Sequence, residues 1–404
     1  MHHPGTIRMT HHLVSSITLL ISLAVNVTSC SREGDAVFGQ PGTPLPNLTE
    51  AQIGQFQAGA ALFNKVYTPA EGLGPLFNEN QCSACHTSPA MGGTTGFEFV
   101  TKATTYDSVS GCNLLILEGG ENIRTQATPL LRDAGIQRAN VPPAASHVGR
   151  FTTPFLFGLG LVEAIDDETI LSRTDPDDRN GDGISGRVGR TEDGRLARFT
   201  RKGEVATIRE FVDSALRLEM GLTTPLGPEE GTIGGTPFPD GTDPAPEPEV
   251  DDTTIDLLTA FVRYLAPPAP TVPRSEAHRD SIEQGRELFE DIGCQSCHTP
   301  IMTTGVHEVR ALHRQRVALY SDLLLHDMGP ASSGVCGRTA TPTEVRTEML
   351  MGLRHRQFYL HNGRAHDLRE AVLAHGGEAQ RSRDAFARLG WVEQEFVVRF
   401  LQSL

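Results

Sequence analysis

The sequence predicts a mainly α-helical fold with long loops and little β-structure, built from two related halves. Apolar residues recur at helical spacing in several stretches, whereas apolar and polar residues alternate only over short runs. A short pattern of two cysteines and a histidine also occurs twice, about two hundred residues apart. The stretches with helical spacing are 206–221, 252–265, 279–291, 367–375 and 391–404.

Length and charge narrow the class of protein. The chain has 404 residues, of which 38% are apolar, so it can bury substantial cores, and we expect a globular protein of two domains. Its formal charge is −15 and it contains no basic run. Because phosphate binding needs an excess of Lys and Arg on some face, nucleic acid is excluded as a partner.

The N-terminus carries the features of an export signal. Arg8 precedes an apolar stretch at 13–27, which is shorter than the roughly 20 residues that a membrane-spanning helix needs. The sequence Val-Thr-Ser-Cys at 27–30 resembles a bacterial lipobox, so Cys30 is either the lipidated first residue of the mature protein or incidental to ordinary cleavage nearby. We expect a lipoprotein signal peptide over 1–29 and a flexible tether over 30–50. The protein would then lie on the periplasmic side of a bacterial membrane, touching the membrane only through the lipid.

The repeated pattern is Cys-x-x-Cys-His, the attachment signal for c-type haem. Two thiols can form thioethers with the haem vinyl groups, and the next residue presents an imidazole to the iron. Two disulfides with unused histidines are the alternative. The residues that carry the pattern are Cys82, Cys85 and His86 in the first half and Cys294, Cys297 and His298 in the second.

The repeat extends beyond these sites. Gly59, Leu62 and Phe63 precede the first site with the same spacing as Gly285, Leu288 and Phe289 before the second, and 149–160 is echoed at 344–353. Residues 224–252 are rich in Pro, Gly and acid, which indicates a loop or linker, and the helix at 252–265 would close the first domain. We therefore expect two cytochrome-c-like haem domains, at 51–270 and 271–404.

Several longer motifs resemble the bacterial di-haem cytochrome c peroxidase superfamily, and within it the di-haem oxidoreductases called thiol oxidoreductase-like. These motifs are LGPLFNENQCSACH, TTPFLFGLGLVEAI, DPDDRNGDGISGR, DLLLHDMG, RTEMLMGL and YLHNGRAHDLREAVLAHGGEA. The resemblance implies two covalently bound haem c groups. One of the two haems would react with substrate and the other would relay electrons.

The resemblance also implies a second axial ligand for the C-terminal haem. In the peroxidases this ligand, usually methionine, stands fourteen residues after the histidine of a Tyr-Phe-His-Asp-Gly segment. Here the segment is Tyr-Leu-His-Asn-Gly at 359–363, so the position falls on His375. Two histidine ligands usually give a lower potential than His/Met. A histidine that merely ends a helix before Gly376 and Gly377 is the alternative, and Met328, close to His326, is a secondary candidate for the iron.

The N-terminal haem lacks a comparable partner. No histidine occurs between His86 and His147, so we expect an open iron position. Peroxide cleavage needs a group that moves a proton, and Glu163 is the only acid in the segment that resembles the family's distal stretch. We expect Glu163 as the acid/base and Arg150 as a propionate or distal partner. A surface glutamate that ends a helix is the alternative for Glu163.

A third site is suggested by DPDDRNGDGISG. Asp178, Asn180 and Asp182, followed by Gly183, match the first half of an EF-hand calcium loop, although position 12 is Gly189 and not Glu. An Asx-rich turn without metal is the alternative. Cys112 and Cys336 either pair with each other or remain free.

These expectations define a peroxidase-like oxidoreductase with two haem c groups and a possible calcium ion. Electrons from a small redox protein or other donor would enter at the C-terminal haem and meet a peroxide-like oxidant at the N-terminal one. A non-catalytic electron-transfer cytochrome and a haem-linked accessory protein are the competing hypotheses.

Overall fold

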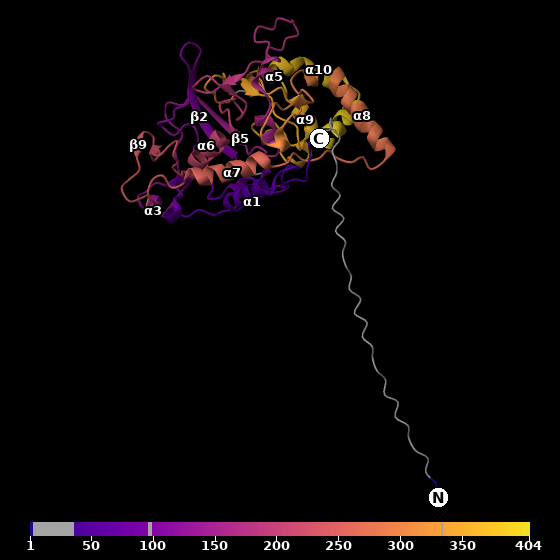
Figure 1. Cartoon of the computed structure of the whole chain (residues 1–404). Helices are drawn as coiled ribbons and strands as arrows, with labels where there is room; N and C mark the ends of the chain where they lie inside the picture. The colour runs from indigo at the N-terminus through magenta and orange to yellow at the C-terminus, as the bar shows by residue number, and fades with distance from the viewer. Residues whose placement is uncertain (3–35, 96–98, 333) are drawn as a thin grey trace. The chain divides into compact units, whose positions relative to one another are not determined.

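The computed structural model describes residues 1–2, 36–95, 99–332 and 334–404. The predicted signal peptide, apart from its first two residues, and Cys30 lie outside the described residues. The described residues from 36 to 404 belong to one compact unit (Figure 1). In the part of the chain that the structure describes, no helix has both the length and the apolar character needed to cross a membrane.

Helices account for 33% of the structure and strands for 14%, so the prediction of a helix-rich fold is confirmed. The helices are α1 (Glu50–Phe63), α2 (Cys82–Cys85), α3 (Pro129–Asp133), α4 (Leu159–Glu163), α5 (Asp167–Leu171), α6 (Ile208–Met220), α7 (Asp252–Tyr264), α8 (Glu276–Asp291), α9 (Leu368–Leu373), α10 (Gln380–Arg388) and α11 (Trp391–Ser403). The strands are β1 (Leu76–Phe77), β2 (Phe99–Asp107), β3 (Gly111–Asn113), β4 (Gln126–Ala127), β5 (His147–Thr152), β6 (Gly189–Arg190), β7 (Leu196–Ala197), β8 (Thr232–Ile233), β9 (Thr236–Pro237), β10 (Met302–Thr303), β11 (Arg316–Val317), β12 (Leu325–Asp327) and β13 (Glu344–Arg346).

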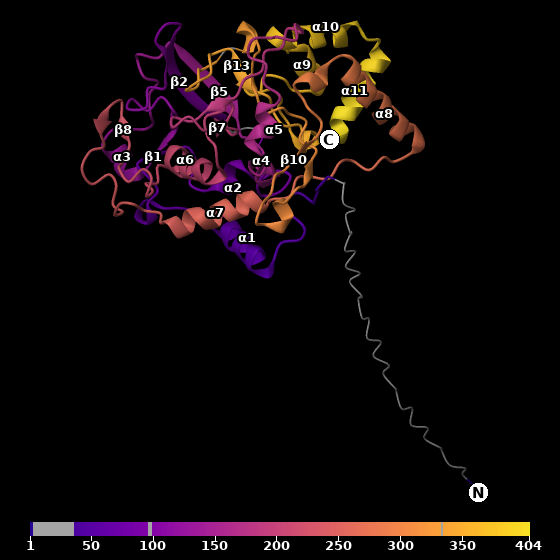
Figure 2. The same cartoon turned by 45° about the horizontal axis from the view of Figure 1, so that its top comes forward.

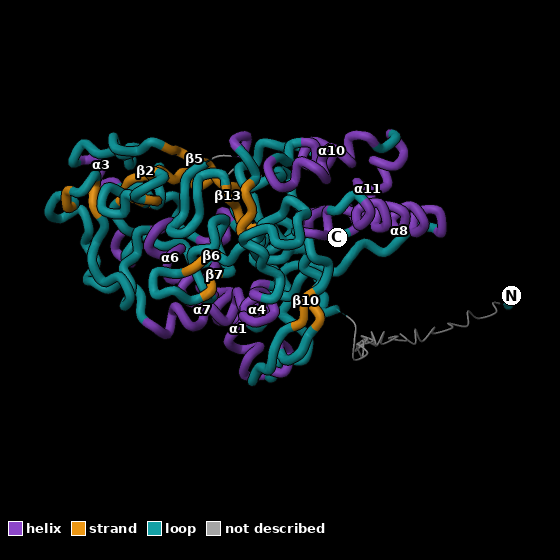
Figure 3. The backbone as a smooth tube through the Cα atoms, turned by 90° about the horizontal axis from the view of Figure 1, so that it is seen from above, coloured by secondary structure: helices purple, strands orange, loops and turns teal. Residues whose placement is uncertain are grey.

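Every stretch with helical spacing contains a helix, namely α6, α7, α8, α9 and α11. The sequence did not predict α10, which is strongly polar, nor the antiparallel sheet of order β3-β2-β5. The other strands of the described residues all pair in two-stranded antiparallel ladders. Figure 3 shows α8, α10 and α11 gathered at one end and β2 and α3 at the other.

The helix pair α1/α7 forms the frame of the first half. Gly59 lies where the helices cross, and an added Cβ there would stand 2.0 Å from the carbonyl oxygen of Leu257. Glycine is therefore required by the close approach of the two backbones. One turn further on, the ring of Phe63 lies 4.8 Å from that of Phe261 and 5.9 Å from that of His86, between centroids.

The pair α8/α11 repeats this frame in the second half (Figure 2). A Cβ at Gly285 would stand 2.0 Å from the carbonyl oxygen of Phe396. The ring of Phe289 lies 5.3 Å from that of Phe400 and 6.5 Å from that of His298. The glycine and the phenylalanine that repeat in sequence thus have the same packing roles in both halves.

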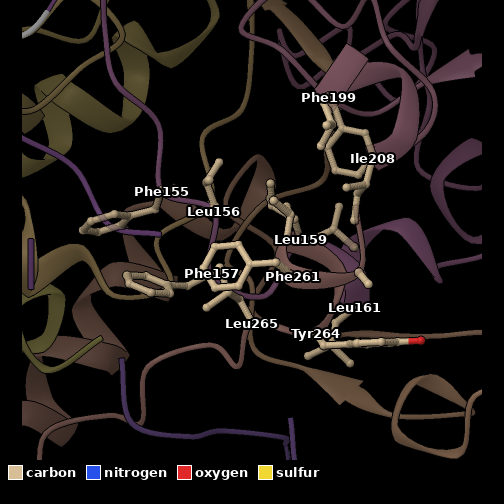
Figure 4. Close-up of a cluster of buried hydrophobic side chains, with 14 of the residues drawn as sticks. Phe155, Leu156, Phe157, Leu159, Leu161, Phe199, Ile208, Phe261, Tyr264 and Leu265 are labelled. Carbon is tan, nitrogen blue, oxygen red and sulfur yellow. The ribbon is translucent and has the colours of Figure 1, made fainter. Parts of the chain in front are cut away.

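The main hydrophobic core extends across the predicted domain boundary at residue 270. It combines side chains of both predicted domains: Phe157, Leu161 and Phe261 from the first pack in the same cluster as Met302 and Leu312 from the second. Figure 4 shows part of this cluster, with side chains from the stretch before and within α4 facing those of α7. A second, smaller core lies around α8, α10 and α11.

The second part of the predicted flexible tether is not flexible but packs against the compact unit. From residue 36 onward the chain pairs with the compact unit: the N–H of Val37 donates to the carbonyl of Arg316 (3.2 Å), and that of Leu45 donates to Tyr264 (2.7 Å). The side chains of Val37 and Leu45 are also buried. Burial of these two side chains contributes to docking the segment, because each removes apolar area from water.

Cys112 on β3 and Cys336 form a disulfide across 224 residues of sequence, which decides between the two alternatives left open by the sequence. The bond ties the β3-β2-β5 sheet to a segment of the second half. Replacing both cysteines with serine should lower the free energy of unfolding by about 2–5 kcal/mol, because the unfolded chain loses a long cross-link. Chemical denaturation of the holoprotein measures this, with reduced wild-type protein as the control. Equal stability of the oxidised wild type and the double variant would contradict the prediction.

Candidate functional site

Two large cavities lie in the compact unit, and each contains one Cys-x-x-Cys-His site. The first measures about 570 Å³ and is lined by Cys82, Cys85 and His86 among others. The second measures about 490 Å³ and is lined by Cys294, Cys297 and His298. Cavities of several hundred Å³ with mainly apolar walls fit a cofactor of drug-like size or larger.

In the first cavity, His86 directly follows α2 and is held by the backbone. Its Nδ1 lies 3.1 Å from the carbonyl oxygen of Gly93. Burial lowers the pKa of His86 to about 4, so the ring is neutral. With Nδ1–H donating to the carbonyl, the lone pair remains on Nε2, which is the arrangement of a metal-ligating histidine.

In the second cavity, two histidines have this arrangement. Nδ1 of His298 lies 3.0 Å from the carbonyl oxygen of Tyr320, and Nδ1 of His375 lies 2.8 Å from that of Ala371. Burial lowers the pKa of both imidazoles, that of His298 to about 4. Both rings are therefore neutral and keep Nε2 for a ligand.

The distance between the two rings is compatible with a metal ion bound by both. The ring centroids of His298 and His375 are 6.5 Å apart. Two metal–nitrogen bonds of about 2 Å, with roughly 1.2 Å from each nitrogen to its ring centre, give roughly 6.4 Å. The residue that the family spacing indicated is thus brought to His298 by the fold, although it also stands just beyond the end of α9.

The four cysteines of the two sites are not paired as disulfides, which removes that alternative. Burial raises the pKa of Cys82 and of Cys294 to about 12. Neutral, buried thiols are poor redox nucleophiles of the thioredoxin type. Their position beside a histidine in a large cavity fits thioether attachment of a haem.

The two cavities share a wall, which is rich in positive charge. Both are lined by Arg150, Phe151, Lys202, Arg346 and Glu348. The segments echoed in the sequence, 149–160 and 344–353, supply most of this wall. The repeat therefore places equivalent segments where the two sites meet.

Glu348 is the centre of this wall. Its carboxylate accepts a hydrogen bond from Arg201 and one of 2.8 Å from Arg356, and it lies 3.6 Å from Arg346. Burial alone would raise the pKa of Glu348, but the surrounding guanidinium groups hold it well below its ordinary value. The carboxylate is therefore ionised.

The cations of this wall outnumber its anions. Burial lowers the pKa of Arg346 and of Arg356, and it lowers that of Lys202 to about 8. Buried cations are costly unless anions partner them. Glu348 is shared by Arg201, Arg346 and Arg356, and Glu204 and Glu344 act on Lys202. A cationic wall of this kind would suit the anionic propionate groups of haem, and the sequence predicted Arg150 as a propionate partner.

Glu163 does not lie among the residues that line the first cavity, which corrects its predicted role as distal acid. Its Oε1 accepts the backbone N–H of Ile208 (2.7 Å), and its Oε2 accepts Nε–H of Arg263 (2.7 Å). Glu163 thus caps the start of α6 and pairs with α7. Its apolar sequence neighbours Leu161 and Val162 are buried in the core, whereas its own carboxylate is bound by α6 and α7.

Replacing Glu163 with glutamine should therefore affect stability and not reactivity. We expect a loss of about 1–3 kcal/mol in the free energy of unfolding, because charged hydrogen bonds are lost. Both haem spectra and the rate of reaction with peroxide should stay normal, as in a Glu168→Gln control on the exposed face of α5. A hundredfold fall in peroxide reactivity would restore the distal role.

His326 differs from His298 and His375 because both of its ring nitrogens contact carboxylates. Its Nε2 lies 2.8 Å from Asp322 Oδ2 and its Nδ1 lies 2.7 Å from Glu378 Oε2. Burial would lower its pKa, but these two hydrogen bonds, with one to Cys297, outweigh burial and raise it far above its ordinary value. Met328 lines the second cavity together with His326.

In the loop predicted to bind calcium, side-chain oxygens accept hydrogen bonds from the loop's own backbone N–H groups. The carboxylate of Asp178 accepts the N–H of Gly183, Oδ1 of Asn180 accepts that of Asp182, and Oδ1 of Asp182 accepts that of Ile184. This is the Asx-turn alternative. Among the described residues, neither group of converging ligand atoms includes this loop.

Arg201, Arg346, Glu348 and Arg356 are site residues that the sequence analysis did not identify. A signal for Arg346 and Glu348 was present in RTEMLMGL, where a charged Arg-Thr-Glu stands in a segment that repeats an uncharged Thr-Thr-Pro of the first half, but Arg201 and Arg356 lie outside this segment. Charges that replace neutral residues within a repeat indicate a local function.

A helix-rich protein with two cavities, each holding a Cys-x-x-Cys-His site, and with a cationic wall between them belongs to the class of di-haem proteins. Residues 144–404, well over half of the chain, match the family model described as "Di-haem oxidoreductase, putative peroxidase". The chain belongs to this family of di-haem oxidoreductases, which implies two haem groups.

Comparison with solved structures gives matches of low identity. Hydrazine synthase of Kuenenia stuttgartiensis has 14% identity, with 98% of this chain and 100% of that chain covered and a TM-score of 0.43. A MauG-like protein associated with microbial copper homeostasis has 15% identity, coverage of 92% and 94%, and a TM-score of 0.43. The di-haem peroxidase BthA of Burkholderia thailandensis has 14% identity, coverage of 92% of each chain, and a TM-score of 0.43. Comparison with curated proteins finds no significant match.

Proposed function

We propose that the protein is an exported di-haem c-type oxidoreductase of the peroxidase type. Covalent haem attachment would use Cys82 and Cys85 in the first cavity and Cys294 and Cys297 in the second. The observation that carries the proposal is the asymmetry of the two cavities. His298 and His375, with ring centroids 6.5 Å apart, both line the second, whereas His86 is the only histidine among the described residues that line the first.

The asymmetry assigns different tasks to the two sites. Haem, when bound, supplies one-electron chemistry and, where an iron position is open, reaction with a peroxide. His298 and His375 would hold the second group from both sides and leave no room for substrate. His86 would hold the first from one side, so the oxidant would react there and electrons would enter at the second site.

The protein's own residues prepare the first cavity for this reaction. The carbonyl of Gly93 fixes the ring of His86 and keeps its proton on Nδ1. Arg150 and Arg201 line the cavity and bring positive charge to it, which favours negative charge that develops on an oxidant or is carried by the propionates. The apolar part of the wall excludes water.

Reaction of the holoprotein with hydrogen peroxide tests the proposal. We expect the N-terminal haem to react rapidly in at least one of the fully oxidised and half-reduced states, followed by stopped-flow absorbance in the Soret region. His298 and His375 should give a low-spin signal in both states. Two persistently low-spin haems and no peroxide reaction in either state would instead support a purely electron-transferring cytochrome.

The physiological partners follow from the same proposal. A small redox protein or other donor would reduce the second haem, and a peroxide-like small molecule would oxidise the first. The protein would act on the periplasmic side of a bacterial membrane, held there by a lipid on Cys30. Labelling with palmitate, compared between wild type and Cys30→Ser, tests the anchor.

A further inference from the structure

His375 lies just beyond α9, a helix of only six residues, and is followed by two glycines. Its ring is oriented by the carbonyl of Ala371, which belongs to the same helix. This hydrogen bond fixes the ring relative to α9 but not relative to His298, which lies in a distant part of the sequence. The position of His375 opposite His298 therefore depends on the contacts that dock the end of α9.

Glu378 is the first side chain after these glycines, and it docks this segment. Its Oε1 accepts hydrogen bonds from Oγ–H of Ser185 (2.6 Å) and from the N–H of Asp327 (3.2 Å). Its Oε2 accepts the N–H of Ser185 (3.0 Å) and lies 2.7 Å from Nδ1 of His326. Burial would raise the pKa of Glu378, but the hydrogen bonds from His326 and Ser185 lower it to about 2. The carboxylate is therefore ionised, and hydrogen bonds to a charged acceptor are the strong ones.

His326 extends these contacts to the segment that carries the other axial histidine. Its Nε2 lies 2.8 Å from Oδ2 of Asp322, and both side chains are only 3% exposed. The backbone N–H of Asp322 donates to the carbonyl oxygen of Cys297 (2.8 Å), the residue directly before His298. A continuous path of hydrogen bonds therefore runs from Glu378 to Cys297 and joins the two segments whose imidazoles line the second cavity.

The protonation of His326 shows that this path is a chain of ions and not a metal site. Possible ligand atoms of Cys297, Asp322 and His326 converge here. Both ring nitrogens of His326 face carboxylate oxygens, so both carry protons, and no lone pair is left for a metal. One buried cation thus lies between two carboxylates, and removing one partner of such a group leaves an uncompensated buried charge.

The turn that carries Glu378 lies directly on the end of β12. Gly377 has a φ of +54°, and an added Cβ there would stand 2.1 Å from the carbonyl oxygen of Asp327. Glycine is therefore required both by the left-handed backbone and by the close approach of the two segments. Because glycine offers no side chain of its own, Glu378 is the side chain that fastens this turn to its neighbours.

We propose that Asp322, His326 and Glu378 form a clamp that positions His375 opposite His298 and so keeps the second iron closed to external ligands. The inference rests on the proposed ligation by His375 and adds three positioning residues that the proposed function does not use. Partners of metal ligands typically change metal affinity or activity by roughly ten- to a hundredfold when they are removed. Without the clamp, His375 would keep its own ring and its bond to Ala371 but would yield more easily to a competing ligand.

Titration of the oxidised holoprotein with cyanide tests the clamp without any turnover. The electron paramagnetic resonance signal of the bis-histidine haem is followed, and in wild type it should persist after cyanide has saturated the first haem. In Glu378→Gln, which keeps the size of the side chain but removes its charge, the cyanide concentration that halves this signal should fall by roughly ten- to a hundredfold. His326→Gln should act in the same direction, and the double variant should be little worse than either single one, because both changes break one chain.

Two further variants complete the test. Ser185→Ala removes one donor to Glu378, so a smaller fall in the same direction is expected, and it keeps the test valid if Glu378→Gln does not fold. Glu163→Gln is the control for lost stability and should resist cyanide as wild type does. Normal resistance of both clamp variants, or an equal fall in Glu163→Gln, would overturn the clamp.

The His375→Ala variant separates the clamp from the ligation on which it rests. If His375→Ala loses the bis-histidine signal while Glu378→Gln resists cyanide normally, the clamp is wrong and the proposed ligation stands. If His375→Ala keeps that signal, the ligation itself is wrong, and the clamp is overturned with it.

Discussion

Replacing His375 with methionine should raise the reduction potential of the C-terminal haem by on the order of 0.1 V or more, within the roughly 0.8 V that axial ligation spans. The structure places His375 opposite His298 with its Nδ1 already bonded to the carbonyl of Ala371, so Nε2 is left for the iron. A thioether at this position favours the reduced metal relative to an imidazole. Potentiometric titration followed by absorbance measures the shift.

A second substitution at the same position separates ligation from packing. His375→Ala should remove the ligand and convert the low-spin signal of the second haem to a high-spin one, with slower turnover by a protein donor. His366→Ala, at an exposed histidine just before α9, should leave both potential and spin state unchanged. If the second haem stays low-spin in the alanine variant, another side chain of the cavity, such as Met328, is the ligand.

Five of the helices could be predicted from sequence because apolar residues recur in them at helical spacing. Helix α7 buries Ile255, Leu258 and Phe261 at helical spacing, and the pattern alone locates it to within one residue. In contrast, β2 reads FVTKATTYD and pairs with strands about ten and fifty residues further on. Its stability depends on partners that no local window contains, so the sheet could not be predicted.

The haem-attaching residues of the candidate site could be predicted from sequence, because attachment of a haem through two thioethers requires the cysteines and the histidine at a fixed spacing in the chain. The residues of Cys-x-x-Cys-His are neighbours in the chain, and the family spacing added His375. Glu163 was misassigned because the direction of a side chain at a helix end depends on tertiary contacts, here Arg263 and the start of α6. Arg201 and Glu348 meet across 147 residues of sequence, and only the fold brings them together.

Replacing Glu348 with glutamine should be among the most destabilising single changes in the chain, with a loss of about 3–5 kcal/mol in the free energy of unfolding. The carboxylate accepts hydrogen bonds from Arg201 and Arg356 and lies close to Arg346. A neutral amide leaves these buried guanidinium groups without their shared anion. Chemical denaturation of the holoprotein, monitored by circular dichroism, measures the loss.

The matched control is Glu192→Gln. Glu192 also pairs with an arginine, Arg338 at 3.2 Å, but its side chain is 82% exposed, so water replaces the lost interaction and little change is expected. If both variants were equally stable, the cations of the shared wall would not depend on Glu348. The propionates of the two haems would then have to neutralise this wall. In that case removal of haem, and not removal of Glu348, would expose the unbalanced charge of the wall.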